Sequence, residues 1–158
     1  MQKVALIAVI VLGLFIGLIW TSGQLTSANQ PLPNPFTQVD LNRSSDGHFY
    51  ADAKVNGHPG RFLIDTGASA IALTEADARR AGIVFDPADY EFLGQGASGI
   101  VRGKEITLSK LDIDDIGATD VKAVVVGGAT VSLLGLPFLN NVDEIVIRKS
   151  QMTLRKAG

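Results

Sequence analysis

The chain has 158 residues, a length that is enough for one domain and an appendage, and its formal net charge is −2. Hydrophobic residues make up 46% and charged residues 19%, so the composition excludes a disordered or collagen-like chain. The slight negative charge argues against a nucleic-acid partner, and the absence of cysteine excludes disulfides, thiolate zinc sites and cysteine nucleophiles. With only two histidines, a histidine metal site or a catalytic triad has few ways to form, so we expect no metal and no cofactor.

Residues 1–20 are predicted to form an N-terminal transmembrane helix. The run from Val4 to Trp20 is uncharged and almost wholly aliphatic, and as a helix it would span about 25 Å. Lys3 precedes the run, so the positive-inside rule predicts a single-pass protein of the cytoplasmic membrane with its N-terminus inside and its domain on the periplasmic side. The alternative is a cleavable signal peptide ending near residues 26–28, which would also export the domain.

Residues 21–45 are predicted to be a linker. Pro31, Pro33 and Pro35 stand on alternate positions among Ser, Thr, Asn and Gln, a composition typical of an extended, semi-stiff spacer. A folded domain over residues 46–158 is expected to follow.

The domain begins with two predicted strands and a helix. Tyr50–Val55 reads as a strand, and Asn56-Gly57 is the dipeptide preferred in a type I′ hairpin turn. Arg61–Ile64 is a short apolar run typical of a buried strand. Residues 74–77 resemble a capping box, and Gly82 is a natural helix end, which predicts a short helix between them.

The remaining segments also predict strands. Residues 91–106 contain four glycines and indicate a flexible hairpin. Alternating or β-branched runs predict strands near residues 106–113 and 121–126, and a final hairpin joins residues 145–147 to 152–154. Short strands at this spacing, with one short helix, indicate a mostly-β domain of the barrel type.

Two motifs suggest chemistry that the sequence does not support further. Residues 94–99 match G-x-G-x-x-G, but a β-like segment follows them instead of the helix that a dinucleotide site requires. Ser69 and Ser98 are candidate nucleophiles, but neither stands in G-x-S-x-G. His48 and His58 lie in turn-rich segments and fit surface or capping positions better than a catalytic base.

The third motif is an aspartate at the end of an apolar strand, where a carboxylate is costly unless it is satisfied. This motif, Asp65-Thr66-Gly67-Ala68, resembles the active-site signature of retropepsin-like aspartic proteases. Leu133-Leu134-Gly135 resembles the second hallmark of that family, and the likeness covers about residues 46–157. It is strongest to the membrane-anchored bacterial branch of single-domain enzymes.

The resemblance implies a retropepsin-like closed β-barrel, with one lobe per chain, and aspartic-type endopeptidase activity on peptides or proteins. Such catalysis needs two carboxylates that share one proton, and this chain has a single D-[ST]-G string. We therefore expect a homodimer in which each chain contributes Asp65. By the same analogy, Thr66 would bond across the two-fold axis, Gly67 would present backbone to water or substrate, Ala68 would belong to the loop, and Ser69 would bond locally.

The resemblance further implies a flap that closes over the substrate. Its tip is expected at Gly94, Gln95, Gly96, Ala97, Ser98 and Gly99. The candidate pocket residues, each of which also fits the core, are Phe62, Ile64, Ile71, Val101 and Leu134.

This sequence departs from the viral members at two places. They carry acidic residues where Ser69 and Ala70 stand, and an arginine where Leu136 follows Gly135. Viral-type substrate contacts are therefore not expected to carry over.

Two other functions remain open. One is a catalytically silent, membrane-tethered module of the same fold that binds peptides. The other is a transmembrane adaptor, for which Gly13 and Gly17 provide the G-x-x-x-G spacing of close helix packing.

Overall fold

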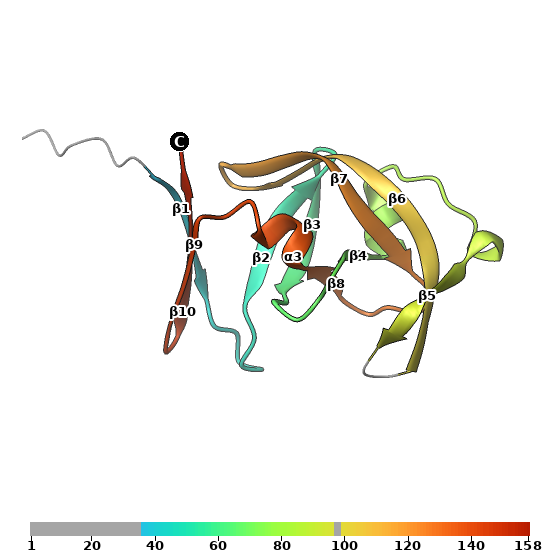
Figure 1. Cartoon of the computed structure of the whole chain (residues 1–158), viewed down its shortest axis with the longest axis horizontal. Coiled ribbons are helices and arrows are strands. Elements are labelled where there is room, and N and C mark those ends of the chain that lie inside the picture. Colours follow the sequence, from blue (N-terminus) through green and yellow to red (C-terminus); the bar gives the residue numbers. More distant parts are fainter. Residues whose placement is uncertain (1–35, 97–98) are drawn as a thin grey trace, which may run out of the picture. The chain divides into compact units, whose positions relative to one another are not determined.

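The computed structural model describes residues 36–96 and 99–158 (Figure 1). The strands are β1 (Phe36–Asn42), β2 (Tyr50–Val55), β3 (His58–Ile64), β4 (Ile71–Thr74), β5 (Glu91–Gly96), β6 (Gly99–Ile113), β7 (Ile116–Val126), β8 (Ser132–Leu134), β9 (Glu144–Arg148) and β10 (Gln151–Ala157). The helical segments are α2 (Glu75–Arg80), the 3₁₀ turn η1 (Pro87–Asp89) and α3 (Leu136–Leu139). The predicted anchor over residues 1–20 lies outside the described residues. No helix within those residues has the length and hydropathy needed to cross a membrane.

The larger sheet closes on itself. Its strand order is β2-β3-β8-β4-β7-β6-β5, and β2 also pairs with β6 through Lys54↔Asp112 and Val55↔Leu111. In the described part of the chain, six strands therefore form a closed barrel, and β5 extends it as the outer partner of β6. The prediction of a mostly-β closed barrel is confirmed.

Two of the predicted turns take the expected geometry. Asn56 and Gly57 have φ values of 51° and 85°, as a type I′ turn between β2 and β3 requires. Thr74 caps α2 by accepting a hydrogen bond from the Asp77 backbone N–H at 3.1 Å, and Gly82 follows the helix with φ of 72°. Both local signals therefore placed an element end correctly.

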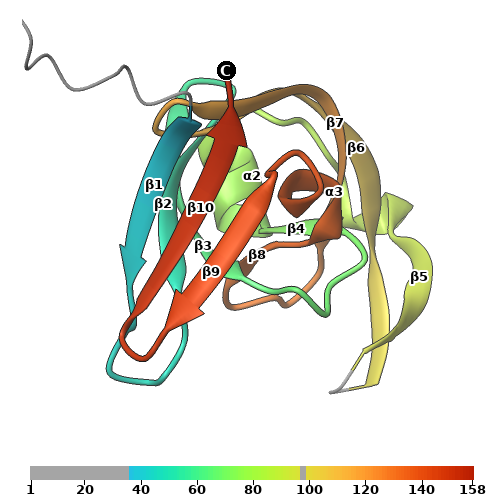
Figure 2. The same ribbon diagram turned by 60° about the vertical axis from the view of Figure 1, so that its left-hand side comes forward.

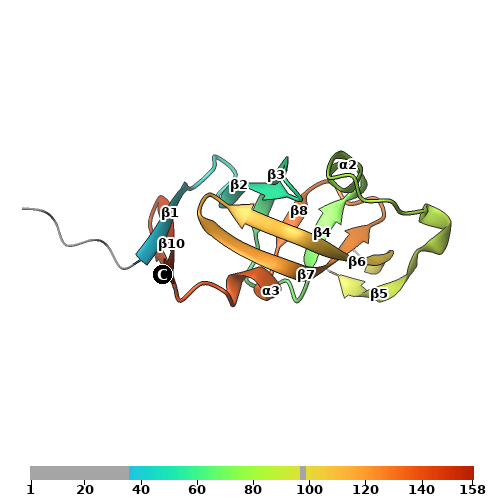
Figure 3. The ribbon, with the colours of Figure 1, turned by 90° about the horizontal axis from the view of Figure 1, so that it is seen from above.

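The prediction of a single helix is wrong, because the described residues contain a second one, α3. It begins after Gly135, and Pro137 stands in its first turn, where a fixed φ and a missing N–H cost nothing. Figure 3 shows α2 and α3 on opposite sides of the barrel strands.

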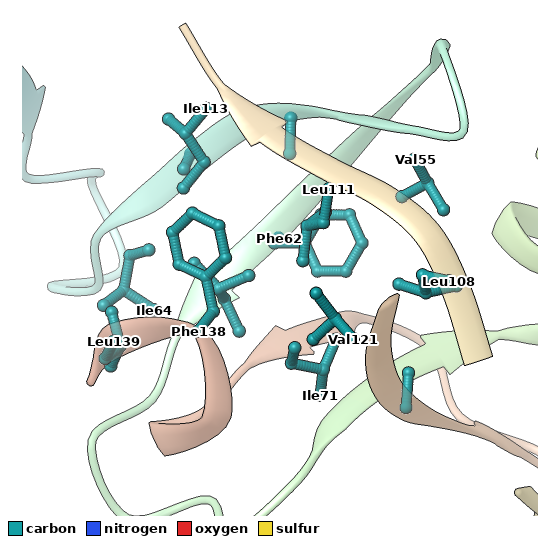
Figure 4. Close-up of a cluster of buried hydrophobic side chains, with 14 of the residues drawn as sticks. Val55, Phe62, Ile64, Ile71, Leu108, Leu111, Ile113, Val121, Phe138 and Leu139 are labelled. Atoms are coloured by element: carbon teal, nitrogen blue, oxygen red, sulfur yellow. The ribbon is translucent and has the colours of Figure 1, made fainter. Parts of the chain in front are cut away.

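The core fills the barrel with aliphatic and aromatic side chains from almost every strand. Phe62, Ile71, Leu108 and Leu111 are fully buried, and Phe138 of α3 packs into the same cluster (Figure 4). Because α3 contributes a buried ring, the segment that follows the second hallmark is anchored to the core.

The predicted linker ends earlier than residue 45, since Phe36–Asn42 forms β1. All seven residues of β1 pair with β10, from Phe36↔Ala157 to Asn42↔Gln151. Figure 2 shows β10 between β1 and β9 in this small sheet. Val39 and Leu41 alternate with polar residues and are buried, so β1 belongs to the folded unit. The closely spaced prolines before β1 have the composition of a spacer, whereas the alternation of β1 itself is that of a strand.

A fragment that begins at residue 46 is expected to be less stable than fragment 36–158 by about 3–6 kcal/mol. It lacks Val39 and Leu41, and burial of each such side chain contributes about 1.5–3 kcal/mol. Urea unfolding followed by circular dichroism measures the difference. Equal unfolding free energies of the two fragments would show that β1 contributes nothing.

Candidate active site

Asp65 follows directly on β3 and is held in a tight turn. Its backbone N–H donates to the Leu134 carbonyl at 3.1 Å, and its own carbonyl accepts from the Ala68 N–H at 3.2 Å. The Gly67 N–H donates to the Asp65 Oδ1 at 2.9 Å. Asp65 is half-buried as a residue, while Thr66 and Gly67 are exposed. One carboxylate oxygen is therefore held by backbone, and the turn presents the group at the surface of the lobe.

Strand β8 supports this turn, because it lies between β3 and β4 in the sheet. It pairs parallel with β3, with Ile64↔Leu134 next to Asp65, and antiparallel with β4 through Ala72↔Leu133. The strands that enter and leave the Asp65 turn are thus spaced by a third strand. The predicted second hallmark lies in this strand and at its end.

Gly135 touches the Asp65 turn with no space for a side chain. A Cβ at this position would lie 2.3 Å from the Ala70 carbonyl oxygen and 2.6 Å from the Ala68 carbonyl oxygen. The next residue, Leu136, donates its backbone N–H to that Ala68 oxygen at 2.9 Å. Only glycine allows the two backbones to approach this closely, which explains the residue type at the end of the Leu133–Gly135 motif.

The predicted flap is an antiparallel hairpin of β5 and β6. Gly94 pairs with Val101, Gln95 with Ile100 and Gly96 with Gly99, and Ala97 and Ser98 lie outside the described residues. Gly94 and Gly99 have φ values of 153° and 121°, which favour glycine. Figure 1 shows the hairpin standing out from the barrel. The G-x-G-x-x-G string therefore lies in a hairpin and does not open a helix.

The family of the chain follows from a comparison with known proteins. The family model described as gag-polyprotein putative aspartyl protease matches residues 51–141, which is more than half of the chain and includes both hallmarks. The chain belongs to this aspartic protease family. The retropepsin-like resemblance is thereby confirmed.

Solved structures agree with this assignment. A retropepsin-like aspartic protease from Rickettsia conorii is 32% identical, with a TM-score of 0.64, over 78% of this chain and 93% of that one. The EIAV protease in complex with the inhibitor HBY-793 is 18% identical, with a TM-score of 0.53, over 66% of this chain and 97% of that one. This second likeness shows the fold alone.

Two curated relatives are similar in sequence. An uncharacterized protein from the cobV 5′ region of Sinorhizobium sp. is 34% identical over 122 residues, 75% of this chain and 52% of its own length. An uncharacterized protein of Rickettsia prowazekii (strain Madrid E) is 33% identical over 117 residues, 74% of this chain and 51% of its own length. The chain therefore spans about half the length of these two relatives.

The loop that follows Asp65 is not supported in the way expected for Ser69. Ser69 is exposed, and in the described part of the chain its hydroxyl makes no hydrogen bond. Backbone bonds of Ala68 and Leu136 hold the turn in its place. The predicted local bond of Ser69 is therefore not found in the described part of the chain.

Four of the five candidate pocket residues are core. Phe62, Ile71 and Leu134 are fully buried, Ile64 is 9% exposed, and Figure 4 shows Phe62, Ile64 and Ile71 within the apolar cluster. Val101 of the flap is only half-buried and stays a candidate. Strand alternation directs the other four side chains into the barrel, which sequence alone could not separate from a pocket.

A groove of about 720 Å³ begins at the end of the Asp65 loop. Its walls come from that loop, from β6 and β7, and from the start of α3. The residues that line it include Ser69, Ala70, Ile106, Lys122, Val124 and Pro137. Ser69 and Ala70, at the positions where acidic residues were noted for viral members, therefore lie on one wall of this groove.

Asp46 does not supply a second catalytic carboxylate. It lies in the turn between β1 and β2, where it accepts hydrogen bonds from the His48 backbone N–H and the Tyr50 hydroxyl. The bond from the His48 N–H, and to a smaller extent the bond from Tyr50, hold the pKa of the Asp46 carboxyl below its usual range. The described residues contain no group of three or more acidic or histidine side chains that could bind a metal ion.

The sequence did not predict a buried polar bridge between α2 and β8. Ser132 is 1% exposed, donates its hydroxyl to the Asp77 Oδ2 at 2.6 Å, and accepts from the Thr74 backbone N–H at 3.0 Å. Arg80 pairs with the same carboxylate. The capping box marked Thr74 and Asp77, but no local signal pointed to a partner so far along the chain.

This bridge predicts a pH dependence of stability. Burial raises the pKa of Asp77, but hydrogen bonds with Ser132 and Thr74 and the ion pair with Arg80 outweigh it and lower the pKa. A lowered folded-state pKa stabilises the fold above the unfolded-state pKa of about 3.9, and this stabilisation is lost as the pH falls through the folded-state pKa. The Asp77→Asn variant should therefore lose less stability than wild type between about pH 5 and about pH 2.

Chemical denaturation at several pH values measures this difference. Asp115→Asn is the matched control, because Asp115 is exposed. Parallel pH curves for wild type and Asp77→Asn would contradict the prediction.

Proposed function

We propose that the chain is one half of a homodimeric aspartic endopeptidase, in which Asp65 of each subunit faces the other across a two-fold axis. The observation that carries the proposal is the Asp65 turn, whose backbone is bonded to Leu134 of β8 and whose Gly67 N–H holds the half-buried Asp65 at its carboxylate. Each chain supplies one such carboxylate, and the reaction needs two. The site therefore needs a second copy of the chain.

The two carboxylates would act as a pair. Two such groups within a few ångströms cannot both ionise, so they share one proton and titrate with two macroscopic pKa values. The ionised carboxylate takes a proton from a water, which attacks the peptide carbonyl carbon. The protonated carboxylate donates a hydrogen bond to the carbonyl oxygen, and the leaving amine then receives a proton. Because both forms must coexist, activity should be highest at acidic pH.

The surroundings of Asp65 suit this role. The Gly67 N–H holds Oδ1 of Asp65, so a backbone amide fixes the orientation of the carboxylate. The Thr66 hydroxyl is exposed and makes no hydrogen bond in the described part of the chain, which suits the proposed contact across the axis. The peptide would lie extended under the β5–β6 flap, and the flap would exclude water as it closes.

The proposed location is the periplasmic side of the cytoplasmic membrane. It rests on the aliphatic run from Val4 to Trp20 and on Lys3 before it. Attachment of both subunits to one membrane would favour pairing, since confinement raises their effective concentration.

Light scattering and peptide-library digestion by fragment 36–158 together test the proposal. We expect a dimer at high concentration, and cleavage that rises from neutral to acidic pH. A monomer at every concentration, with no peptide cleaved, would contradict it and leave the tethered peptide-binding module as the function.

A further inference from the structure

We propose that the hydrogen bond between Ser132 and Asp77 positions the catalytic loop, because it fixes the strand against which the Asp65 turn is built. In this role Ser132 and Asp77 are positioning residues that never touch substrate. The catalytic part of this inference rests on the proposed function, whereas the structural part does not.

The Ser132 hydroxyl donates its hydrogen bond to a single acceptor, the Asp77 carboxylate. Its oxygen accepts the Thr74 backbone N–H at 3.0 Å, so the hydroxyl hydrogen is directed to Asp77 Oδ2 at 2.6 Å. The Asp77 side chain is only 14% exposed, and a charge-assisted bond in such surroundings is stronger than a neutral one. The bridge therefore ties the end of β4 and the start of α2 to the first residue of β8.

Strand β8 depends on this tie because it is short. It has three residues, Ser132–Leu134, and it pairs with β3 at three positions and with β4 at one. A strand held by so few pairs slides more easily than a long one, so a side-chain anchor at its first residue matters.

A shift of β8 would reach Asp65 directly. Leu134 accepts the Asp65 N–H, and Gly135 contacts the turn so closely that even a Cβ would overlap the Ala68 and Ala70 oxygens. Because no free space separates the two backbones, a displacement of β8 also displaces the Asp65 turn. Misplacement of a catalytic group by about 1 Å costs about 10²-fold in rate. The hydrogen bond of Ser132 to Asp77 thus determines where the Asp65 carboxylate lies.

A purely structural role, as part of the cap of α2, would be the competing explanation. The cap itself is a different bond, from the Asp77 N–H to Thr74 Oγ1 at 3.1 Å. Thr74→Ala removes this cap but keeps the backbone N–H that bonds Ser132. Ser132→Ala removes the bridge but keeps the cap. Thr74→Ala also removes the Thr74 hydroxyl from beside the Asp77 carboxyl, but it leaves the Ser132–Asp77 bond in place, so only Ser132→Ala unties β8.

Hydrogen exchange of backbone amides in fragment 36–158 is the deciding measurement. The reporters are the Asp65 and Leu136 amides, which bond to Leu134 and Ala68, and the reference is Met152 in the small sheet, which does not contain β8. We expect Ser132→Ala to speed exchange at Asp65 and Leu136 by about tenfold more than at Met152. Thr74→Ala should change all three alike, and Ser132→Thr should restore the wild-type pattern.

Kinetics add a second readout on the same variants. With any peptide that the wild type cleaves, Ser132→Ala should lower kcat about tenfold or more at unchanged KM, while Thr74→Ala leaves kcat near wild type. Uniform exchange changes in Ser132→Ala, or equal kcat losses in both variants, would overturn the inference. If no peptide is cleaved by wild type, the proposed function fails, and the exchange pattern still decides the structural inference.

Discussion

The Asp65→Asn variant of fragment 36–158 should fold and dimerise, but it should cleave peptides about 10²–10⁴-fold more slowly than wild type. An amide is isosteric with the carboxylate and still accepts the Gly67 N–H, so the turn stays intact. It cannot take a proton from water, so the base is lost. Initial rates on a peptide found by library digestion, at acidic pH, measure the effect.

Mixing experiments extend this test to the shared site. When wild-type and Asp65→Asn subunits are mixed in equal amounts and allowed to exchange, about one quarter of the dimers contain two wild-type chains. If both carboxylates are needed, activity per wild-type chain should fall by about half. Activity that stays proportional to the wild-type chains alone would show that one Asp65 suffices.

The Gly135→Ala variant should have the second-largest effect. Its Cβ would lie 2.3 Å from the Ala70 oxygen and 2.6 Å from the Ala68 oxygen, and both are backbone atoms that cannot rotate away. The turn must move, at a cost of about 1–3 kcal/mol in the free energy of unfolding. Because the displaced segment carries Asp65, kcat should fall by roughly 10²-fold as well.

Gly60→Ala is the matched control for this substitution. A Cβ at Gly60 would meet only the ring of Phe62, at 3.1 Å, so its neighbour is a side chain. Thermal unfolding and initial rates of the two variants should separate clearly. Equal activities of Gly135→Ala and wild type would show that the close approach does not position the loop.

Short-range signals explain what the sequence could predict. Asn56-Gly57 specified a turn with two positive φ values, and Thr74 specified a helix start, because each depends on atoms only a few residues apart. The closed barrel and the place of the Asp65 turn followed from the resemblance carried by Asp65–Ala68 and Leu133–Gly135, both of which lie within the matched residues 51–141.

Long-range packing explains what the sequence could not predict. The strand β1 is fixed by β10, at the other end of the chain, and the bond from Ser132 to Asp77 joins residues 55 positions apart. The alternation of Val39 and Leu41 in β1 does not identify β10 as the partner strand, and the bond from Ser132 to Asp77 leaves no periodic pattern at all. The candidate pocket residues Phe62 and Leu134 failed for the same reason, since an apolar side chain in a strand fits a core and a pocket equally well.

The pairing of Phe36 with Ala157 puts both ends of the folded unit at one corner. A tandem fusion can therefore join the end of one copy to the start of the next with a flexible peptide, so that both halves of the site reside in a single polypeptide. If the proposed homodimer is the active form, such a chain would stay active at dilutions at which separate subunits dissociate. The shortest joining peptide that restores hydrolysis would measure the gap between the two corners, at about 3.3 Å for each extended residue.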